Sequence, residues 1–372
     1  MQDTKIALLL SGGVDSCVAL HLLCEQGYRP DLFYIYIGAD EEMSEMSCTA
    51  QDDVLVCRMM ARRYGLDFEI VNLHKQYYER VVGYMMEQVK RGFTPNSDVM
   101  CNRLIKFGCF DDEVGYRYDK IATGHYARVV ERDGAVWMAT AKDRLKDQTD
   151  FLCRIAIHLG RLMFPIGHLL KSEVRAIAAQ AKLPSAARPD SQGICFLGKL
   201  NFTHFLNDHL GEREGLIVEQ ESGNVLGRHK GYWFYTIGQR KGLYMSGGPW
   251  FVVRKDVARN IIYVTRGDLS PARYRRTFRL AQLMPLGGVK EMCQLNGKEI
   301  TFKIRHVQNF TPGRFILQEN GEALVTSARD VSGVAPGQFC TLYDSSSDLC
   351  LGSGEIVPEL PVSAIKSDGV TE

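Results

Sequence analysis

The sequence lacks the long apolar runs that a membrane protein requires. Its purely apolar stretches, such as Ile6 to Leu10, are only a few residues long, whereas a membrane-spanning helix needs about 20 apolar residues. The amino terminus, from Met1 to Lys5, also lacks the ordered charged, apolar and small-residue segments of a signal peptide. We therefore expect no membrane span and a cytoplasmic location.

An excess of charge of either sign is also missing. The chain has 45 Lys and Arg against 44 Asp and Glu, which leaves a formal net charge of +1. No overall basic field therefore indicates nucleic-acid binding, so any RNA contact must be a local patch. One basic run, Arg273, Arg275, Arg276 and Arg279, is either such a patch or an ordinary solvated strand.

No Cys-x-x-Cys motif occurs, so a zinc ribbon or a thioredoxin-like site finds no support. The 11 cysteines are odd in number and are spread from Cys17 to Cys350, unlike the framework of a disulfide-stabilised secreted domain. We expect most of them to be buried thiols that pack as small apolar groups.

The length of 372 residues predicts two or three domains at about 150 residues each. Up to about residue 205, short apolar runs alternate with helical periodicity, which predicts a Rossmann-like parallel sheet covered by helices. Strands are expected at residues 5–10, 32–37, 68–71 and 120–123, and helices at 16–26, 48–64, 77–90 and 172–181.

Beyond about residue 207 the pattern changes to short alternating segments separated by turn pairs such as Asn296-Gly297 and Asn320-Gly321, which is typical of an all-β structure. The fold class we predict is multidomain α/β + β. The expected domains are an α/β domain over 1–205, a small β-rich central domain over 206–271 and a C-terminal β-barrel over 272–358, followed by a loose tail over 359–372.

The first motif that carries chemistry is Ser11-Gly12-Gly13-Val14-Asp15-Ser16, between an expected strand and an expected helix. Glycines there let the backbone approach an anion, and the free amides of the helix start point at it. The motif is neither a Walker sequence nor the three-glycine dinucleotide fingerprint. We interpret it as a phosphate-binding loop, in which Asp15 suits a Mg²⁺ ion that bridges phosphate oxygens.

The second motif is the polar loop Thr94 to Asn102, which leads into a helix expected from about Asn102. A thiol at a helix start has a lowered pKa, so Cys101 is a candidate reactive cysteine. Asp98 is placed three residues earlier and is a candidate proton acceptor or donor. A buried structural thiol and an ordinary helix cap remain the alternatives.

The third motif, Asp190 to Gly198, holds Cys195 between two glycines, which give the thiol conformational freedom. With Cys101, it suggests a pair in which one thiol carries or donates sulfur and the other resolves the product by disulfide exchange. A packed cysteine is again the alternative reading.

These motifs, together with Ala122 to Ala127, Lys146-Asp147-Gln148 and Tyr235 to Leu243, closely resemble the tRNA-specific 2-thiouridylases of the MnmA type, within the ATP pyrophosphatases. The resemblance extends to about Ile356. It implies an ATP pyrophosphatase domain, a central domain and a C-terminal β-barrel, and an enzyme that replaces the C2 oxygen of the wobble uridine in the tRNA anticodon loop by sulfur.

The resemblance also implies roles for individual residues. A persulfide would form on Cys195, and a Cys101–Cys195 disulfide would complete release of the product. ATP would be held by Leu9, Leu10, Ser11, Gly12, Gly13, Val14, Asp15 and Ser16, with Ile37 and Gly124 near the adenine. Asn96, Ser97 and Asp98 would meet the target base, and His125, Lys146, Asp147, Gln148, Arg305, His306 and Gln338 would touch tRNA.

The chemistry requires ATP because the C2 oxygen is a poor leaving group until it is adenylated. A protein sulfur donor that carries a persulfide is the expected partner. Three alternatives stay open: an iron–sulfur-cluster-dependent thiolase with Cys101, Cys195 and Asp98 as ligands, an ATP pyrophosphatase ligase acting on a small metabolite, and a non-catalytic RNA-binding protein.

Overall fold

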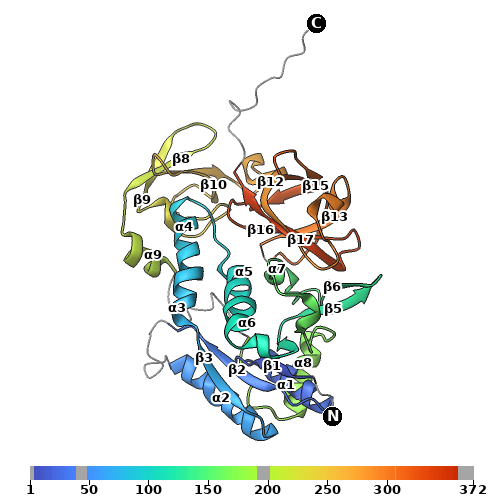
Figure 1. Cartoon of the computed structure of the whole chain (residues 1–372). Helices are drawn as coiled ribbons and strands as arrows, with labels where there is room; N and C mark the ends of the chain where they lie inside the picture. Colours follow the sequence, from blue (N-terminus) through green and yellow to red (C-terminus); the bar gives the residue numbers. More distant parts are fainter. Residues whose placement is uncertain (1–3, 39–47, 191–201, 306, 359–372) are drawn as a thin grey trace.

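A computed structural model of the chain describes residues 4–38, 48–190, 202–305 and 307–358 (Figure 1). Its strands form three sheets: a five-stranded sheet in the order β3-β2-β1-β4-β7, a four-stranded sheet, and an eight-stranded sheet that includes a barrel. Within these residue ranges, no helix is long and apolar enough to cross a membrane. The predicted α/β + β fold class is confirmed.

The first sheet is parallel and is covered by helices on both faces. Ala7 and Leu9 of its central strand pack into one apolar cluster, and Leu8 and Leu10 into the other, as the alternation of a strand requires. Its strands are β1 (Ile6–Leu9), β2 (Asp31–Tyr36), β3 (Phe68–Asn72), β4 (Lys120–Thr123) and β7 (Leu162–Met163).

The helices of this domain come close to the predicted ranges. The helix expected at 77–90 starts earlier, because α3 continues through a π-helical turn into α4. The helical elements are α1 (Val14–Glu25), α2 (Cys48–Tyr64), α3 (His74–Tyr77), η2 (Tyr78–Val82), α4 (Gly83–Lys90), α5 (Ser97–Cys101), η3 (Asn102–Cys109), α6 (Phe110–Glu113), η4 (Gly115–Arg117), α7 (Thr149–Leu152), η5 (Leu159–Arg161), α8 (Lys171–Gln180) and α9 (Phe202–Leu210).

The central sheet has the order β10-β11-β8-β9. Val252, Ile262 and Val264 are fully buried in its own small core. Its strands are β8 (Gly215–Glu219), β9 (Val225–His229), β10 (Trp250–Asp256) and β11 (Ile261–Arg266), and short 3-10 turns η6 (Tyr232–Phe234) and η7 (Pro271–Arg273) flank them.

The C-terminal strands close into a barrel because β17 pairs with both β16 and β12. The barrel core includes Phe278, Phe302 and Phe315. Its strands are β12 (Tyr274–Pro285), β13 (Glu299–Ile304), β14 (Thr311–Leu317), β15 (Ala323–Ser332), β16 (Phe339–Tyr343) and β17 (Leu349–Val357), with η8 (Met292–Leu295) between β12 and β13.

One β-hairpin crosses the expected boundary between the first domain and the barrel. The domain boundaries themselves remain predictions. The hairpin β5 (Ala127–Arg132) and β6 (Ala135–Thr140) belongs to the first domain in sequence but extends the barrel sheet, since β6 pairs with β17. Leu349 lies opposite Ala139, and Cys350 opposite Met138. The α/β domain and the barrel therefore share a sheet, side by side in Figure 1.

A buried ion pair lies in the same seam. The Asp147 carboxylate is 3.1 Å from the Lys303 ammonium, and the two side chains are 0% and 2% exposed. The carboxylate also accepts hydrogen bonds from the Ala141 amide at 3.0 Å and the Thr149 hydroxyl at 2.8 Å. Burial raises the pKa of Asp147, and the Lys303 charge counteracts part of that rise.

We expect the substitution Lys303→Met to lower the free energy of unfolding by about 3–5 kcal/mol at neutral pH, because it leaves a buried carboxylate unpaired. Urea denaturation measures the loss. The control Arg276→Gln removes the exposed pair with Asp330 and should cost less than about 1 kcal/mol.

The loss in Lys303→Met should shrink as the pH falls. The folded state raises the pKa of Asp147, so it binds the proton more tightly than the unfolded chain does, and protonation stabilises the fold. A deficit that is small at neutral pH, or one that grows on acidification, would contradict this assignment.

Candidate functional site

The phosphate-binding loop lies where the strand order of the parallel sheet reverses. From β1 the chain goes to β2 on one side, and β4 lies on the other. Leu9 is paired with Thr123, so the loop that follows β1 and Gly124, which follows β4, are neighbours at the carboxyl ends of the strands. Ile37 follows the adjacent strand β2. In open α/β sheets, ligands bind at this switch point.

The loop leaves the start of α1 open to an anion. Gly13 is the N-cap of α1 and offers no side-chain hydrogen bond to the first amides. Gly12 has a φ of 74°, a value that glycine adopts without strain. The Ser11 and Ser16 hydroxyls lie 3.1 Å apart, and Ser16 also donates to the Gly13 carbonyl at 3.1 Å. Uncapped amides beside two hydroxyls are suited to bind phosphate oxygens.

Gly124 packs so closely against the backbone of the phosphate-binding loop that no side chain fits at this position. A Cβ atom at this position would lie 2.6 Å from the Ser16 amide nitrogen and 2.8 Å from the Asp15 carbonyl carbon, both of which are backbone atoms. The glycine therefore lets the end of β4 approach the start of α1. This contact ties the predicted residue to the loop, although no contact with adenine follows from it.

Two cations that no motif had indicated border the loop. The Lys171 ammonium contacts the Asp15 carboxylate at 2.7 and 2.9 Å and the Asp190 carboxylate at 2.9 Å. Arg188 donates to the Gly12 carbonyl at 3.0 Å and pairs with Asp53 at 2.6 Å. Lys171 and Arg188 come from segments far along the chain, so spacing could not reveal them.

Asp190 brings the beginning of the third motif to the loop. It binds Lys171 together with Lys146 at 2.8 Å and Arg175 at 2.5 Å. Burial raises the pKa of Asp190, but these hydrogen bonds outweigh it and hold the pKa far below its usual range. The carboxylate is therefore ionised at neutral pH. Cys195, five residues later, lies outside the described residues.

The Asp15 carboxylate, predicted to bind Mg²⁺, already contacts two side chains of the protein. Both carboxylate oxygens contact Lys171, and one also accepts a hydrogen bond from the Tyr126 hydroxyl at 2.9 Å. Asp15 fits as a single carboxylate ligand only if the ion takes its other ligands from phosphate and water, which is the usual arrangement for Mg²⁺. Within the described residues, no group of three or more His, Cys, Asp or Glu is arranged to hold a metal.

The second motif folds differently from the expectation. The helix begins at Ser97 instead of Asn102, because the Asn96 side chain caps it by accepting a hydrogen bond from the Val99 amide at 3.2 Å. Cys101 is thus the last residue of α5 and continues directly into η3. The helix dipole acts mainly within the first turn, so the predicted activation of this thiol at a helix start was wrong.

Cys101 is 2% exposed and belongs to the apolar cluster on one face of the parallel sheet. Asn96 and Ser97, which were expected to meet the base, are also buried. Asp98 lies in the first turn of α5. Cys101, Asn96 and Ser97 are therefore shielded in this structure, whereas Asp98 is half-buried.

A segment of the barrel holds the start of the second motif. Gln338 donates hydrogen bonds from its amide to the Thr94 and Pro95 carbonyls, both at 3.0 Å, and the Thr94 amide donates to the Pro336 carbonyl at 2.8 Å. Gln338 is itself buried. In this conformation it positions the second motif, and its side chain is not available to tRNA.

The other residues expected to touch tRNA are divided between surface and interior. Lys146 is exposed, and Gln148 accepts a hydrogen bond from the Tyr126 amide at 2.9 Å. Arg305 donates to the Ile237 carbonyl of the central domain at 2.7 Å. The Asp147 side chain is fully buried, so we no longer expect it to contact RNA. His306 lies outside the described residues.

His125 stands beside the loop as a neutral group. Its ring is hydrogen-bonded to the Thr123 hydroxyl at 2.7 Å and lies between Phe107 and Phe164. Burial lowers the pKa of His125 well below its ordinary value, and the Lys106 charge lowers it further. The imidazole can therefore donate or accept a hydrogen bond at neutral pH but adds no positive charge.

Comparison with known proteins agrees with this architecture. Three family models match in chain order: the tRNA methyl transferase HUP domain over residues 4–199, the tRNA methyl transferase PRC-barrel domain over 203–266, and the aminomethyltransferase beta-barrel domain over 278–356. A tRNA-specific 2-thiouridylase MnmA 1 from Bacteroides thetaiotaomicron is 53% identical over 95% of this chain and 99% of its own. The chain belongs to the MnmA family.

Other MnmA proteins match at the same level. The tRNA-specific 2-thiouridylase MnmA of Parabacteroides distasonis is 54% identical over 95% of this chain and 99% of its own, and that of Porphyromonas gingivalis is 53% identical over 94% and 98%. The three family models together reach all three sheets, and the first of them includes the phosphate-binding loop.

We expect the substitution Gly124→Ala to weaken nucleotide binding by more than tenfold, because the added methyl group would displace the Asp15 and Ser16 backbone. Equilibrium binding of a fluorescent ATP analogue measures the effect. The control Gly227→Ala places its methyl group no closer than 3.9 Å to any neighbour. Equal affinities of the two variants would show that Gly124 does not shape the loop.

Proposed function

We propose that this protein is a tRNA-uridine 2-sulfurtransferase, which uses ATP to replace the C2 oxygen of the wobble uridine by sulfur. The identity of more than half of all residues with 2-thiouridylases, over nearly the full length of both chains, carries this proposal. The uncapped start of α1 at the switch point supports it, since it offers the phosphate site that an adenylating enzyme needs.

The first step is adenylation of the base. The uridine C2 oxygen attacks the α-phosphorus of ATP, the bond from that phosphorus to the bridging oxygen breaks, and pyrophosphate leaves. Amides at the start of α1, with the Lys171 and Arg188 cations, stabilise the charge on the phosphates. Bound Mg²⁺ would supply further charge neutralisation there, with Asp15 as its protein ligand.

The second step transfers sulfur. The terminal sulfur of a Cys195 persulfide attacks C2, and AMP leaves with the former C2 oxygen. The Cys101 thiolate then attacks the Cys195 sulfur, which breaks the sulfur–sulfur bond, releases 2-thiouridine and forms a Cys101–Cys195 disulfide. A thiol reductant returns the two electrons, and a donor protein reloads Cys195. Because Cys101 is 2% exposed, this route requires a rearrangement that exposes its thiol.

The direct test incubates the protein with unmodified tRNA, ATP, Mg²⁺ and a persulfide donor, followed by mass analysis of the nucleosides. We expect 2-thiouridine at the wobble position, with AMP and pyrophosphate formed in proportion. Methylated uridine, the product that the names of two matching family models suggest, would overturn the proposal. RNA binding without AMP formation would also overturn it.

Replacement of Cys101 or Cys195 by Ser should abolish sulfur insertion while AMP formation survives, because neither thiol takes part in adenylation. The control Cys293→Ser changes an exposed barrel cysteine and should thiolate like the wild type. Full thiolation by either Ser variant would refute the assigned roles. Visible absorption after anaerobic purification, lost in Cys101→Ser, would instead indicate the cluster-dependent route.

A further inference from the structure

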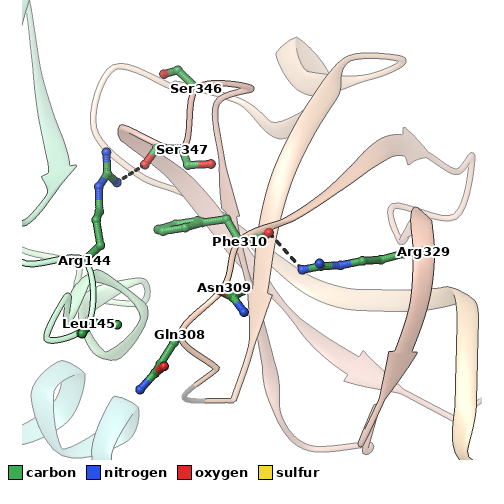
Figure 2. A pocket seen from close by; sticks show the side chains of 8 residues that line it. All are labelled: Arg144, Leu145, Gln308, Asn309, Phe310, Arg329, Ser346 and Ser347. Atoms are coloured by element: carbon green, nitrogen blue, oxygen red, sulfur yellow. Dashed lines mark hydrogen bonds between the residues drawn. The ribbon is translucent and has the colours of Figure 1, made fainter.

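A cavity of about 590 Å³ lies on the seam between the first domain and the barrel (Figure 2). Arg144 and Leu145 come from the loop after β6, and Gln308, Asn309 and Phe310 from the loop between β13 and β14. Arg329 of β15 and two serines of the turn between β16 and β17 complete the lining. Neither the phosphate-binding loop nor either cysteine motif contributes to it.

The cavity holds two positive charges that no carboxylate of the described residues neutralises. Arg144 donates to the Ser347 carbonyl at 2.5 Å and to the Thr140 hydroxyl, and Arg329 donates to the Phe310 carbonyl at 3.2 Å and the Thr311 hydroxyl at 3.0 Å. All of these acceptors are neutral. Each arginine makes these hydrogen bonds through a single guanidinium nitrogen, so the N–H groups of its other nitrogens remain available to a ligand.

Three other arginines of the barrel are neutralised by carboxylates. In the basic run that the sequence offered as an RNA patch, Arg273 pairs with Asp268 at 3.0 Å, Arg276 pairs with Asp330 at 2.7 Å, and Arg279 pairs with Glu322. The observed charge distribution therefore favours the cavity over that run as the site for an anion.

Carboxylates close to the cavity already have other partners. Asp344 accepts hydrogen bonds from the Asp348 and Leu349 amides of its own turn. Asp143 accepts from the Leu145, Lys146 and Lys171 amides. Beneath the Phe310 ring, the Lys303 charge is paired with Asp147. Within the described residues, none of these carboxylates forms an ion pair with Arg144 or Arg329.

The remaining lining suits a nucleotide. Gln308 and Asn309 are exposed side-chain amides, which donate and accept hydrogen bonds at base edges. Arg144 and Arg329 lie on opposite sides of Phe310 in Figure 2, so the cavity offers two separate cationic groups to the phosphates of a strand. In sequence, Arg144 precedes Lys146 and Gln308 follows Arg305, both of which were expected to touch tRNA.

We propose that this cavity binds one nucleotide of the substrate tRNA, with its flanking phosphates on Arg144 and Arg329 and its base edge on Gln308 and Asn309. The inference rests on the proposed function for the identity of the RNA. It assigns a contact outside the catalytic motifs, which anchors the tRNA across the seam.

The test compares the tRNA affinity of full-length variants by filter binding over a series of salt concentrations. Arg329→Gln and Arg144→Gln should each weaken binding several-fold and reduce the slope of log Kd against log salt by about one, because each removes a phosphate contact. The control Arg314→Gln removes an exposed barrel arginine that is paired with Glu299 and should leave both quantities unchanged. The Arg314→Gln control should also thiolate tRNA at the wild-type rate.

A second variant separates binding from folding. Gln308→Glu adds a negative charge inside the cavity without removing any side-chain hydrogen bond that the described structure contains, so its melting temperature should match that of the wild type while tRNA affinity falls several-fold. Gln318→Glu makes the same change in the exposed turn between β14 and β15 and should bind normally. Equal affinities of Gln308→Glu and Gln318→Glu would overturn the proposal.

A free mononucleotide offers the same chemistry, so titration with UMP distinguishes the two sources. Binding of UMP that Arg329→Gln abolishes, with tRNA affinity unchanged, would make the cavity a mononucleotide site and overturn the proposal. If the wild type binds tRNA but does not thiolate it, the proposed function fails, while the affinities of the cavity variants for tRNA still test the proposed binding site. If it thiolates and the cavity variants bind normally, the cavity assignment alone fails.

Discussion

The pairing of Asp147 with Lys303 is the interaction on which the arrangement of the two largest parts of the molecule depends. A charge that is buried away from water destabilises the fold strongly when its partner is removed. Here Asp147 comes from the α/β domain and Lys303 from the barrel. With the β6–β17 pairing beside it, this constraint sets the position of the barrel over the parallel sheet. Separating the domains would expose both groups at once.

Two other features of the seam follow from that position. Gln338 donates to the carbonyls of Thr94 and Pro95 and thereby holds the start of the motif that contains Cys101. Arg144 reaches the turn between β16 and β17 and forms one wall of the seam cavity. The same docking therefore holds the start of the second motif and forms the wall of the seam cavity.

A chain of contacts links this seam to the phosphate-binding loop. Next to Asp147, Gln148 accepts a hydrogen bond from the Tyr126 amide, and the Tyr126 hydroxyl donates to Asp15. Lys171 then joins Asp15 to Asp190, where the segment with Cys195 begins. Each link is local, yet together they join the phosphate-binding loop, Asp190 and the barrel in one connected polar network.

Local patterns in the sequence determined the elements of this protein, because alternation and helical periodicity depend on neighbours along the chain. They predicted the parallel sheet, the change to β-structure and the loop from Ser11 to Ser16, and the motifs predicted the family. Tertiary structure alone decided that Lys171 and Arg188 border the loop, that Asp147 is buried, and that Cys101 lies within a helix capped by Asn96. It also decided which arginines find carboxylates, since ion pairing and burial depend on residues that are distant in sequence and meet only when the domains dock.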